Sequence, residues 1–314
     1  MLARHQRSRT LNTSKRGFTL IEVLIVIVII GILAALILPA VNRARMRAQI
    51  AKVQSELESI KASITEFNVR FKNNPPSSVT LYEAPGGWAG DSLSQRAIKK
   101  LWPQFSFAVS RDINGDGDST DSFTLEGSEC LVFFLGGMID GTSGAFRGFS
   151  KNPANPLALD NGTRDGPFFE FIGGINPTTK APTGRIVDSD GDSLPEYVDS
   201  LASQTQPIVY LSSNNGLGYR AGDDDSIAPY YKDAARREAY NSDGFQLISP
   251  GFDFSYGTGG SLETEDANNN TTLDPGEDTN GNGILDTTRA QILSGSRESE
   301  KDNITNFHTG QLGD

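Results

Sequence analysis

The stretch GFTLIEVLIVIVIIGILAALILPAV, residues 17–41, is apolar almost throughout, yet it carries one acid, Glu22, near its start. As a helix, residues 18–41 span about 36 Å, which is enough to cross a hydrocarbon core of about 30 Å. A carboxylate inside a membrane costs roughly 2.5–3.5 kcal/mol on insertion scales, so an acid at this place is expected to have a function. The stretch therefore predicts a membrane-spanning helix in which Glu22 needs a positive partner.

Charge is distributed unevenly along the chain. Residues 1–17 carry basic side chains and no acid, whereas the whole chain has a net charge of -11. The part after Lys72 is therefore strongly acidic. Because such a surface repels phosphate backbones, we expect no nucleic-acid partner.

The residues around the helix start resemble a known family. A basic leader that ends at Gly17, then FTLIE (residues 18–22) and a long apolar helix, is similar to the class III signal of type IV prepilins and type II secretion pseudopilins. The resemblance implies that a prepilin peptidase cuts between Gly17 and Phe18 and methylates the new amino group. It also implies a single-pass precursor in a bacterial inner membrane, with the leader in the cytoplasm. The head would be periplasmic, or extracellular after filament assembly.

Cleavage would give Glu22 its partner. The chain would then begin with a cationic amine at Phe18, and Glu22 lies four residues further along the same helical face. The amine of the same chain or that of the next subunit can neutralise the carboxylate, and the resemblance favours the next subunit. The expected partners are other copies or related pilins in a filament, the prepilin peptidase and an inner-membrane assembly platform.

The sequence divides into a leader (1–17), a transmembrane and assembly helix (18–41), an amphipathic helix (42–74) and a head (75–314) with an insertion near 260–295. In the amphipathic helix, apolar residues recur at steps of three and four, which predicts one buried stripe. They are Ile50, Val53, Leu57, Ile60, Ile64, Phe67 and Phe71. We expect this stripe to pack on the chain's own domain, with a coiled coil as the alternative.

The head consists of short apolar runs separated by turn residues. Runs of this length and composition predict strands of an antiparallel sheet. They are SFAVS (106–110), CLVFFLGGM (130–138), PFFEFIG (167–173), PIVYLSS (207–213) and GFQLISPG (244–251). The expected fold is α+β, with a long N-terminal helix, half transmembrane and half amphipathic, packed on a small antiparallel β-sheet head with long acidic loops.

The insertion contains a twelve-residue repeat, DANNNTTLDPGE followed by DTNGNGILDTTR. Acids or amides at positions one, three, five and nine are typical of a calcium loop of the EF type. The candidate ligands are Asp266, Asn268, Asn270, Asp274 and Glu277 in the first copy, and Asp278, Asn280, Asn282 and Asp286 in the second. The first copy has Thr271 in place of the turn glycine, and the second ends on Arg289 instead of a glutamate. Each copy is incomplete, so ligands shared between them are plausible.

Two further stretches follow the same spacing. DSDGDSLPEYVD offers Asp188, Asp190, Asp192, Glu196 and Asp199, and DINGDGDSTD offers Asp112, Asn114, Asp116, Asp118 and Asp121. GFQLISPGFD and the terminal KDNITNF resemble the end of the major pseudopilin domain, which implies Asp253 and Asp302 as calcium ligands. The alternative is a set of Asx turns without metal. Calcium is favoured because so many carboxylates repel one another unless a cation is near.

The sequence predicts no catalytic site, because one histidine, His308, remains outside the leader and no Walker loop or nucleophile elbow occurs. We therefore expect a structural subunit of a type II secretion pseudopilus or a type IV pilus-like filament, with a calcium-stabilised head. The alternative is a monomeric membrane-anchored binding or hydrolytic domain outside the cytoplasm. Glu22 distinguishes the two, since a simple tether does not need it.

Overall fold

The computed structural model describes residues 18–314, except 161, 221, 225, 234, 236 and 237. The chain forms two compact units, one that extends to Ala48 and one from Gln49 to Asp314, and each is described by itself. The predicted leader, with Gly17, lies outside the described residues. Its cleavage therefore stays a prediction.

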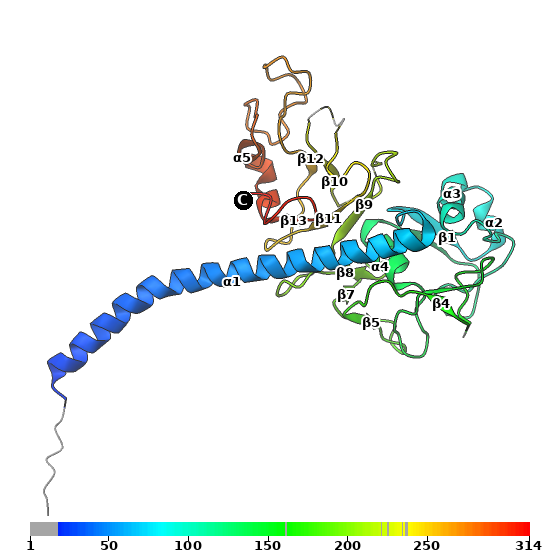
Figure 1. Cartoon of the computed structure of the whole chain (residues 1–314), viewed down its shortest axis with the longest axis horizontal. Coiled ribbons are helices and arrows are strands. Elements are labelled where there is room, and N and C mark those ends of the chain that lie inside the picture. The colour runs from blue at the N-terminus through cyan, green and yellow to red at the C-terminus, as the bar shows by residue number, and fades with distance from the viewer. Residues whose placement is uncertain (1–17, 161, 221, 225, 234, 236–237) are drawn as a thin grey trace, which may run out of the picture. The chain divides into compact units, whose positions relative to one another are not determined.

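Helix α1, Leu20–Phe71, begins in the first unit (Figure 1). In that unit its large apolar side chains are exposed, as Leu24 and Ile29 show at 50% and 51%. Among the described residues, α1 is the one helix whose length and apolar composition suffice to cross a membrane. Pro39 lies inside the helix without ending it.

In the second unit, the remainder of α1 has one buried face. All seven residues of the predicted stripe are buried, from Ile50 at 9% to Phe67 at 0% exposure. The ring of Phe67 lies 6.0 Å from that of Phe134 and 5.3 Å from that of Phe168, both in the head. The stripe therefore packs on the chain's own domain, as predicted.

A polar contact fixes the same part of α1. Glu56 forms an ion pair with Arg185, accepts a hydrogen bond of 3.1 Å from the Tyr197 hydroxyl, and is mostly buried. The Arg185 guanidinium lies over the Tyr197 ring, 4.5 Å from its centroid. This contact sets the position of the helix along the head more specifically than apolar packing does alone.

The head consists of short elements joined by long loops (Figure 1). Its helices are α2 (Pro85–Trp88), α3 (Ser92–Leu101), α4 (Gly127–Gly136), α5 (Arg289–Ile292) and the 3-10 helix η1 (Gly295–Asp302). Its strands are β1 (Val79–Tyr82), β2 (Ser122–Leu125), β3 (Phe149–Ser150), β4 (Arg164–Asp165), β5 (Gly173–Ile175), β6 (Pro182–Gly184), β7 (Ile186–Val187), β8 (Glu196–Tyr197), β9 (Val209–Ser212), β10 (Ala228–Tyr231), β11 (Phe245–Ser249), β12 (Gly259–Ser261) and β13 (Ile304–Thr305).

The strands form small sheets. The largest has the order β13-β11-β9 and is antiparallel, with Ile248 opposite Val209 and Ser249 opposite Ile304. The pairs β1-β2, β3-β4, β5-β6 and β7-β8 are also antiparallel, whereas β10 and β12 are parallel. The predicted α+β fold and the strands expected in 207–213 and 244–251 are thus confirmed.

Three predicted strands are wrong. Residues 130–136 belong to helix α4, whose start is fixed by a reciprocal capping box between Glu126 and Glu129. Residues 106–110 form turns, and 167–172 form a loop whose rings pack on Phe67 and Tyr197. An apolar run of this length does not by itself distinguish strand, helix and packed loop. Cys130, on α4, is a buried free thiol.

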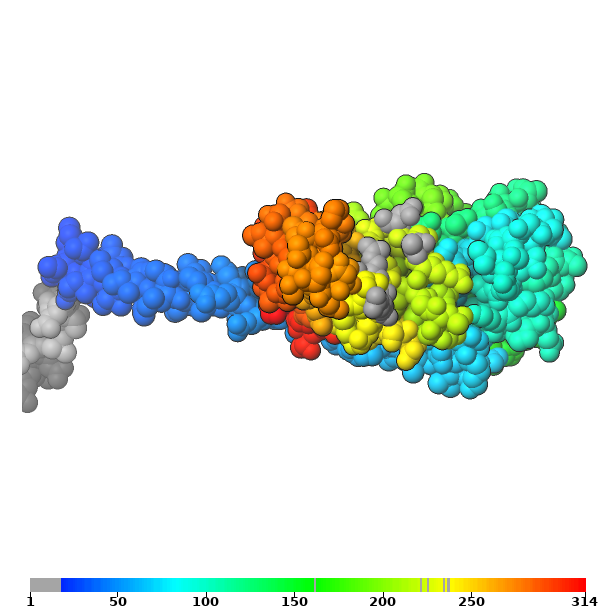
Figure 2. Space-filling view, turned by 90° about the horizontal axis from the view of Figure 1, so that it is seen from above, coloured from blue at the N-terminus to red at the C-terminus, as the bar shows by residue number. Residues whose placement is uncertain are grey.

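The insertion forms a surface lobe of the head, drawn in orange in Figure 2. Within η1, which follows the insertion, Arg297 and Glu300 form a fully buried ion pair 2.7 Å long. Arg297 also donates a hydrogen bond of 2.8 Å to the Ser261 carbonyl at the end of β12. The loops of the insertion are therefore held by the core and do not hang free.

Candidate functional site

At the helix start, Glu22 and Thr19 form a capping box. Glu22 Oε2 accepts hydrogen bonds from the Thr19 amide, at 2.8 Å, and from its hydroxyl, at 2.7 Å. In return, the Glu22 amide donates to Thr19 Oγ1 at 3.2 Å. Thr19 was not singled out from the sequence, although T-x-x-E is a recognised capping pattern. The box holds the carboxylate at the first turn of α1, four residues after the exposed Phe18.

Four acidic loops in the head share one backbone conformation. We name them by their first residues: the Asp112, Asp188, Asp266 and Asp278 loops. In each, the first carboxylate accepts the amide of the sixth residue, at 3.0, 3.2, 2.8 and 2.9 Å respectively. The side chain of the third residue accepts a hydrogen bond from the backbone amide of the fifth residue. The side chain of the fifth residue accepts one from the backbone amide of the seventh. The loops are therefore equivalent, although their sequences differ.

The sixth residue has a positive φ in every loop. The values are 98° at Gly117, 74° at Ser193, 61° at Thr271 and 74° at Gly283. This is the position at which an EF-type loop requires glycine for its sharp turn. Ser193 and Thr271 thus adopt the glycine conformation despite their side chains.

A buried glutamate accepts the amide of the second residue in each loop. It is Glu83 for the Asp112 loop, Glu196 for the Asp188 loop, Glu277 for the Asp266 loop and Glu265 for the Asp278 loop, at 2.6, 2.7, 2.9 and 2.8 Å. All four are at most 7% exposed. Glu277 is the only one at position twelve of its own loop. Glu83 and Glu265 were not predicted from the sequence, because they lie before the loops whose backbone amides they accept.

Glu265 takes the place of the missing twelfth-position glutamate of the Asp278 loop. In the Asp266 loop, Glu277 accepts the amides of Ala267 and Asp274, the second and ninth residues. Glu265 accepts the amides of the second and ninth residues of the Asp278 loop in the same way, at 2.8 and 3.2 Å. Glu265, which precedes the first copy, thus occupies in the second copy the position that Glu277 has in the first. Sharing of metal ligands between the copies stays a prediction.

The remaining side chains of the two repeat loops converge on one acid each. The amides of Asn268 and Asn270 both donate to Asp274 Oδ2, at 2.7 Å. Those of Asn280 and Asn282 both donate to Asp286 Oδ2, at 2.6 and 2.8 Å. The oxygens of these four side-chain amides accept backbone amides of the same loops. Oxygen-only sets of this kind suit hard divalent cations.

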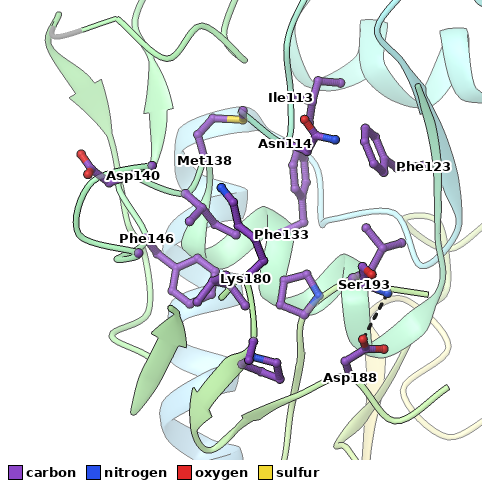
Figure 3. A pocket seen from close by; sticks show the side chains of 18 of the residues that line it. Ile113, Asn114, Phe123, Phe133, Met138, Asp140, Phe146, Lys180, Asp188 and Ser193 are labelled. Atoms are coloured by element: carbon purple, nitrogen blue, oxygen red, sulfur yellow. Dashed lines mark hydrogen bonds between the residues drawn. The ribbon is translucent and has the colours of Figure 1, made fainter. Parts of the chain in front are cut away.

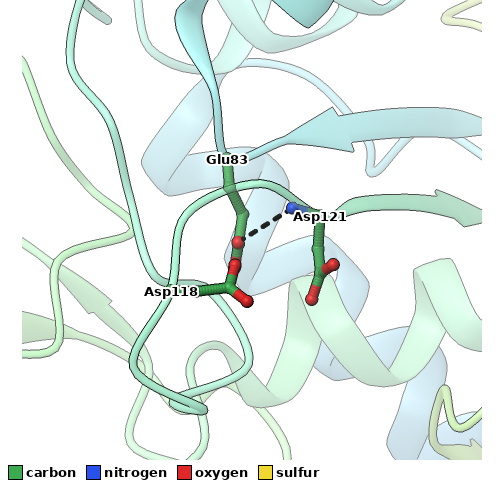
Figure 4. Close-up of side chains that lie close together, drawn as sticks. All are labelled: Glu83, Asp118 and Asp121. Atoms are coloured by element: carbon green, nitrogen blue, oxygen red, sulfur yellow. Dashed lines mark hydrogen bonds between the residues drawn. The ribbon is translucent and has the colours of Figure 1, made fainter.

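The Asp112 loop joins acids from two segments (Figure 4). Carboxylate oxygens of Glu83, Asp118 and Asp121 lie within 4.8 Å of one another. Glu83 is fully buried at the end of β1 and accepts the amides of Ile113 and Asp121. Asp112, Asn114 and Asp116 shape the loop through their own hydrogen bonds, and Asn114 also donates to Asp121 at 2.9 Å.

The Asp188 loop meets an acid of helix α4. A carboxylate oxygen of Glu129 lies within 4.8 Å of oxygens of Asp190 and Asp192. Burial, and next the charges of Asp192, Glu196 and Asp190, raise the pKa of Glu129 to about 8, against the hydrogen bond from the Glu126 amide, which lowers it. Burial also raises the pKa of Asp192. Glu129 was not predicted as part of this site.

Asp199, at position twelve of the Asp188 loop, is tied into the core by hydrogen bonds. It is buried at 1% exposure, and its oxygens accept hydrogen bonds from the Leu201 amide, the Gln204 side chain and the Ser249 hydroxyl. Its carboxylate therefore ties the loop end to β11. Its role as a calcium ligand stays a prediction, and Glu129 is the acid from outside the loop that lies nearest to Asp190 and Asp192 among the described groups.

Asp253 and Asp302, which the resemblance implied as calcium ligands, are linked by a hydrogen bond, and their role as ligands stays a prediction. Asp302 Oδ2 accepts the amides of Phe252 and Asp253, while Asp253 Oδ1 accepts that of Ser255. The second oxygen of Asp302 is buried and has no hydrogen-bond partner within the described chain. Burial, and next the charge of Asp253, raise the pKa of Asp302.

A cavity of about 500 Å³ separates two of the loops (Figure 3). Its walls are largely apolar and include Phe123, Phe133, Met138 and Phe146. Residues of both the Asp112 loop and the Asp188 loop line its edge. The two loops are thus neighbours across apolar space.

The chain has the features of a membrane-anchored protein with a long N-terminal helix and a folded head. These features are the exposed apolar first part of α1, the capping box at its start, and the head itself. A family model described as "Prokaryotic N-terminal methylation motif" matches residues 12–38. A type IV major pilin protein PilE1 of Neisseria gonorrhoeae is 40% identical over 110 residues, which cover 33% of this chain and 67% of the pilin. The type II secretion system core protein G of Klebsiella pneumoniae is 34% identical over 74 residues, 23% of this chain and 53% of that protein.

The chain therefore belongs to the family of type IV pilins and type II secretion pseudopilins. It spans between about a third and two thirds of the length of the first curated relatives that it matches. No solved structure matches it.

Proposed function

We propose that this protein is a structural subunit of a type II secretion pseudopilus or a type IV pilus-like filament. The observation that carries the proposal is the start of α1, where a single acid is held by a capping box at the head of an exposed apolar helix. An exposed apolar surface of this size requires a membrane or other helices around it. The one cysteine and the resemblance near 244–253 favour the secretion pseudopilus.

Assembly would follow removal of the leader between Gly17 and Phe18 by a prepilin peptidase, with methylation of the new amine. That amine is a cation four residues from Glu22. In a filament the amine of one subunit would neutralise Glu22 of its neighbour and thereby set the axial position of one helix against the next. The capping box supports this role, because it holds the carboxylate in one place before a neighbour arrives.

Replacement of Glu22 tests this assembly step. Glu22→Leu removes a charge from an apolar helix, so membrane insertion is expected to persist while the amount of sheared filament falls at least tenfold. Glu66→Leu is the matched control, since it removes an exposed acid from the same helix outside the apolar stretch. If Glu22→Leu protein enters filaments at the level of the unchanged protein, a monomeric membrane-anchored domain becomes the better explanation.

We also propose that the acidic loops bind calcium and that calcium stabilises the head. The four buried glutamates support this, since each places a carboxylate beside a loop that already gathers acids and amides. Carboxylates held this close repel one another, and a divalent cation would remove that repulsion. Extracellular calcium modules bind with dissociation constants of about 10⁻⁴ to 10⁻³ M.

Chelation tests the calcium proposal. Thermal unfolding of the full chain in detergent is compared in millimolar calcium and in EDTA, with magnesium as the control ion. We expect a higher melting temperature in calcium, because a ligand that binds the native state alone stabilises it by mass action. Identical melting temperatures in calcium and EDTA would contradict the proposal that calcium stabilises the head.

A further inference from the structure

We propose that three arginines at the end of the apolar span of α1 bind the phosphates of anionic phospholipids. They are Arg43, Arg45 and Arg47, and we call them the arginine collar. The inference rests on the proposed function, which puts the apolar part of α1 in a membrane. It adds the class of lipid that this end of the helix selects.

The arginine collar begins directly where the apolar span ends. Val41 is the last apolar residue of the span, and the arginines follow it by two, four and six positions. At a rise of about 1.5 Å per residue, they lie about 3 to 9 Å further along the helix axis. The headgroup layer extends about 5 to 8 Å beyond the hydrocarbon core on each side of a membrane. A span that fills the hydrocarbon core therefore puts the arginine collar at the depth of the lipid phosphates.

Among the described residues, the arginine collar has no anionic partner. All three side chains are exposed, and none forms an ion pair with another described residue. Along α1, no acid occurs between Glu22 and Glu56. Arg43 and Arg47 lie four positions apart on one face of the helix, where like charges repel each other. A phosphate between the two guanidinium groups would replace that repulsion by attraction.

Arginine has the chemistry that a phosphate at this depth requires. Its planar guanidinium donates two parallel hydrogen bonds to one phosphate group. Its aliphatic stem lies along apolar surface while the charge reaches the headgroups. At about 100° per residue, Arg45 lies on the opposite side of the helix from Arg43 and Arg47. The arginine collar therefore offers phosphate sites on two sides of α1.

Membrane orientation does not explain the arginine collar. With the leader in the cytoplasm, as the resemblance implies, these arginines lie at the other end of the span. Basic residues that orient a membrane protein gather on the cytoplasmic side. The arginine collar opposes that bias and therefore needs another role.

The competing partner is a carboxylate of a neighbouring subunit in the filament. Under that explanation, the arginines have no preference among lipids before assembly. An anionic lipid headgroup, by contrast, attracts each basic residue near the surface about fivefold more strongly than a neutral one does. Lipid selection by the unassembled chain therefore separates the two explanations.

The lipids that stay with the protein are the decisive measurement. The full chain is reconstituted in vesicles of equal parts phosphatidylglycerol and phosphatidylcholine and then extracted in mild detergent. Mass spectrometry counts the lipids that remain bound to it. We expect phosphatidylglycerol to be enriched at least fivefold over phosphatidylcholine. The triple variant Arg43→Gln/Arg45→Gln/Arg47→Gln should retain the two lipids in equal amounts.

Two control variants test position and charge. Lys52→Gln neutralises an exposed basic residue of the same helix about 16 Å beyond Val41, outside the headgroup layer. It should keep the enrichment of the unchanged protein. Replacement of all three arginines by lysine retains the charge that selects anionic headgroups, so it should also keep the enrichment.

Each result decides one statement. A chain that an alkaline wash removes from the vesicles overturns membrane insertion, and the proposed function with it. A chain that stays in the vesicles but retains both lipids equally overturns lipid binding by the arginine collar and leaves the proposed function in place. If the triple glutamine variant then loses filaments, the arginines contact a neighbouring subunit instead. Full enrichment in the triple glutamine variant also overturns the assignment, as does its loss in Lys52→Gln or in the triple lysine variant.

Discussion

The second part of α1 and the acidic loops are both held by buried side chains, but the chemistry differs. The helix buries an apolar stripe from Ile50 to Phe71, in which every contact is favourable in the protein alone. The loops place buried glutamates, among them Glu83, Glu196 and Glu265, beside further acids. The helix interface is therefore held by apolar packing, whereas the loops gather carboxylates whose repulsion the proposed calcium would relieve.

The largest effect should come from the helix. Phe67→Ala removes a fully buried ring that packs on Phe134 and Phe168, and such truncations cost about 3–5 kcal/mol. Urea unfolding should show this loss equally in calcium and in EDTA, because no ion takes part. Val69→Ala, at a position 65% exposed, should change stability by less than about 0.5 kcal/mol. A Phe67→Ala loss that depended on calcium would contradict the comparison.

The next effect should depend on the ion. Glu265→Gln removes the carboxylate that accepts two backbone amides of the Asp278 loop. At calcium about a hundredfold above the dissociation constant, one site stabilises by about 2.7 kcal/mol, and the variant should lose most of it. Urea unfolding of this variant in calcium and in EDTA measures that increment. Glu263→Gln, at an exposed acid two residues away, is the control and should keep it.

The raised pKa values of buried carboxylates predict a third difference between the helix and the loops, namely how stability depends on pH. Burial raises the pKa of Glu129 to about 8 and that of Asp224 to about 6, so the folded state holds more protons than the unfolded state between about pH 4 and 8. Without calcium, stability is therefore highest in acid and falls as pH rises through this window. Melting temperatures in EDTA should be lower at pH 8 than at pH 5. Glu129→Gln should reduce this slope, and a steeper slope would contradict the assigned cause.

The same contrast explains what could be predicted from sequence. The apolar stripe is a local periodicity, so all seven of its residues were found. The acids and amides that lie near one another in the repeat loops, from Asp266 to Asp286, were also visible in the sequence. The glutamates supplied by other elements were not, since nothing near Glu83 or Glu129 in the sequence indicates which loop the fold brings beside it.

Helix α4 illustrates a different limit. Its apolar run, 130–136, suits a buried strand as well as a buried helix, and length does not decide between them. The capping pair Glu126 and Glu129, three residues apart, was the local signal for a helix. Thr19 and Glu22 carry the same spacing at the start of α1.

The smallest effect should come from a backbone position in the loops. Thr271 has a φ of 61°, and this left-handed conformation costs an L-residue about 1–2 kcal/mol. Gly283, at the equivalent place in the Asp278 loop, adopts it without that cost. Because glycine loses more entropy on folding, Thr271→Gly should stabilise by about 0.5–1 kcal/mol net. Thr272→Gly, one residue on and without a positive φ, should instead destabilise. If both variants destabilise equally in urea unfolding, Thr271 is not held in the glycine conformation, and the equivalence of the four loops fails at that position.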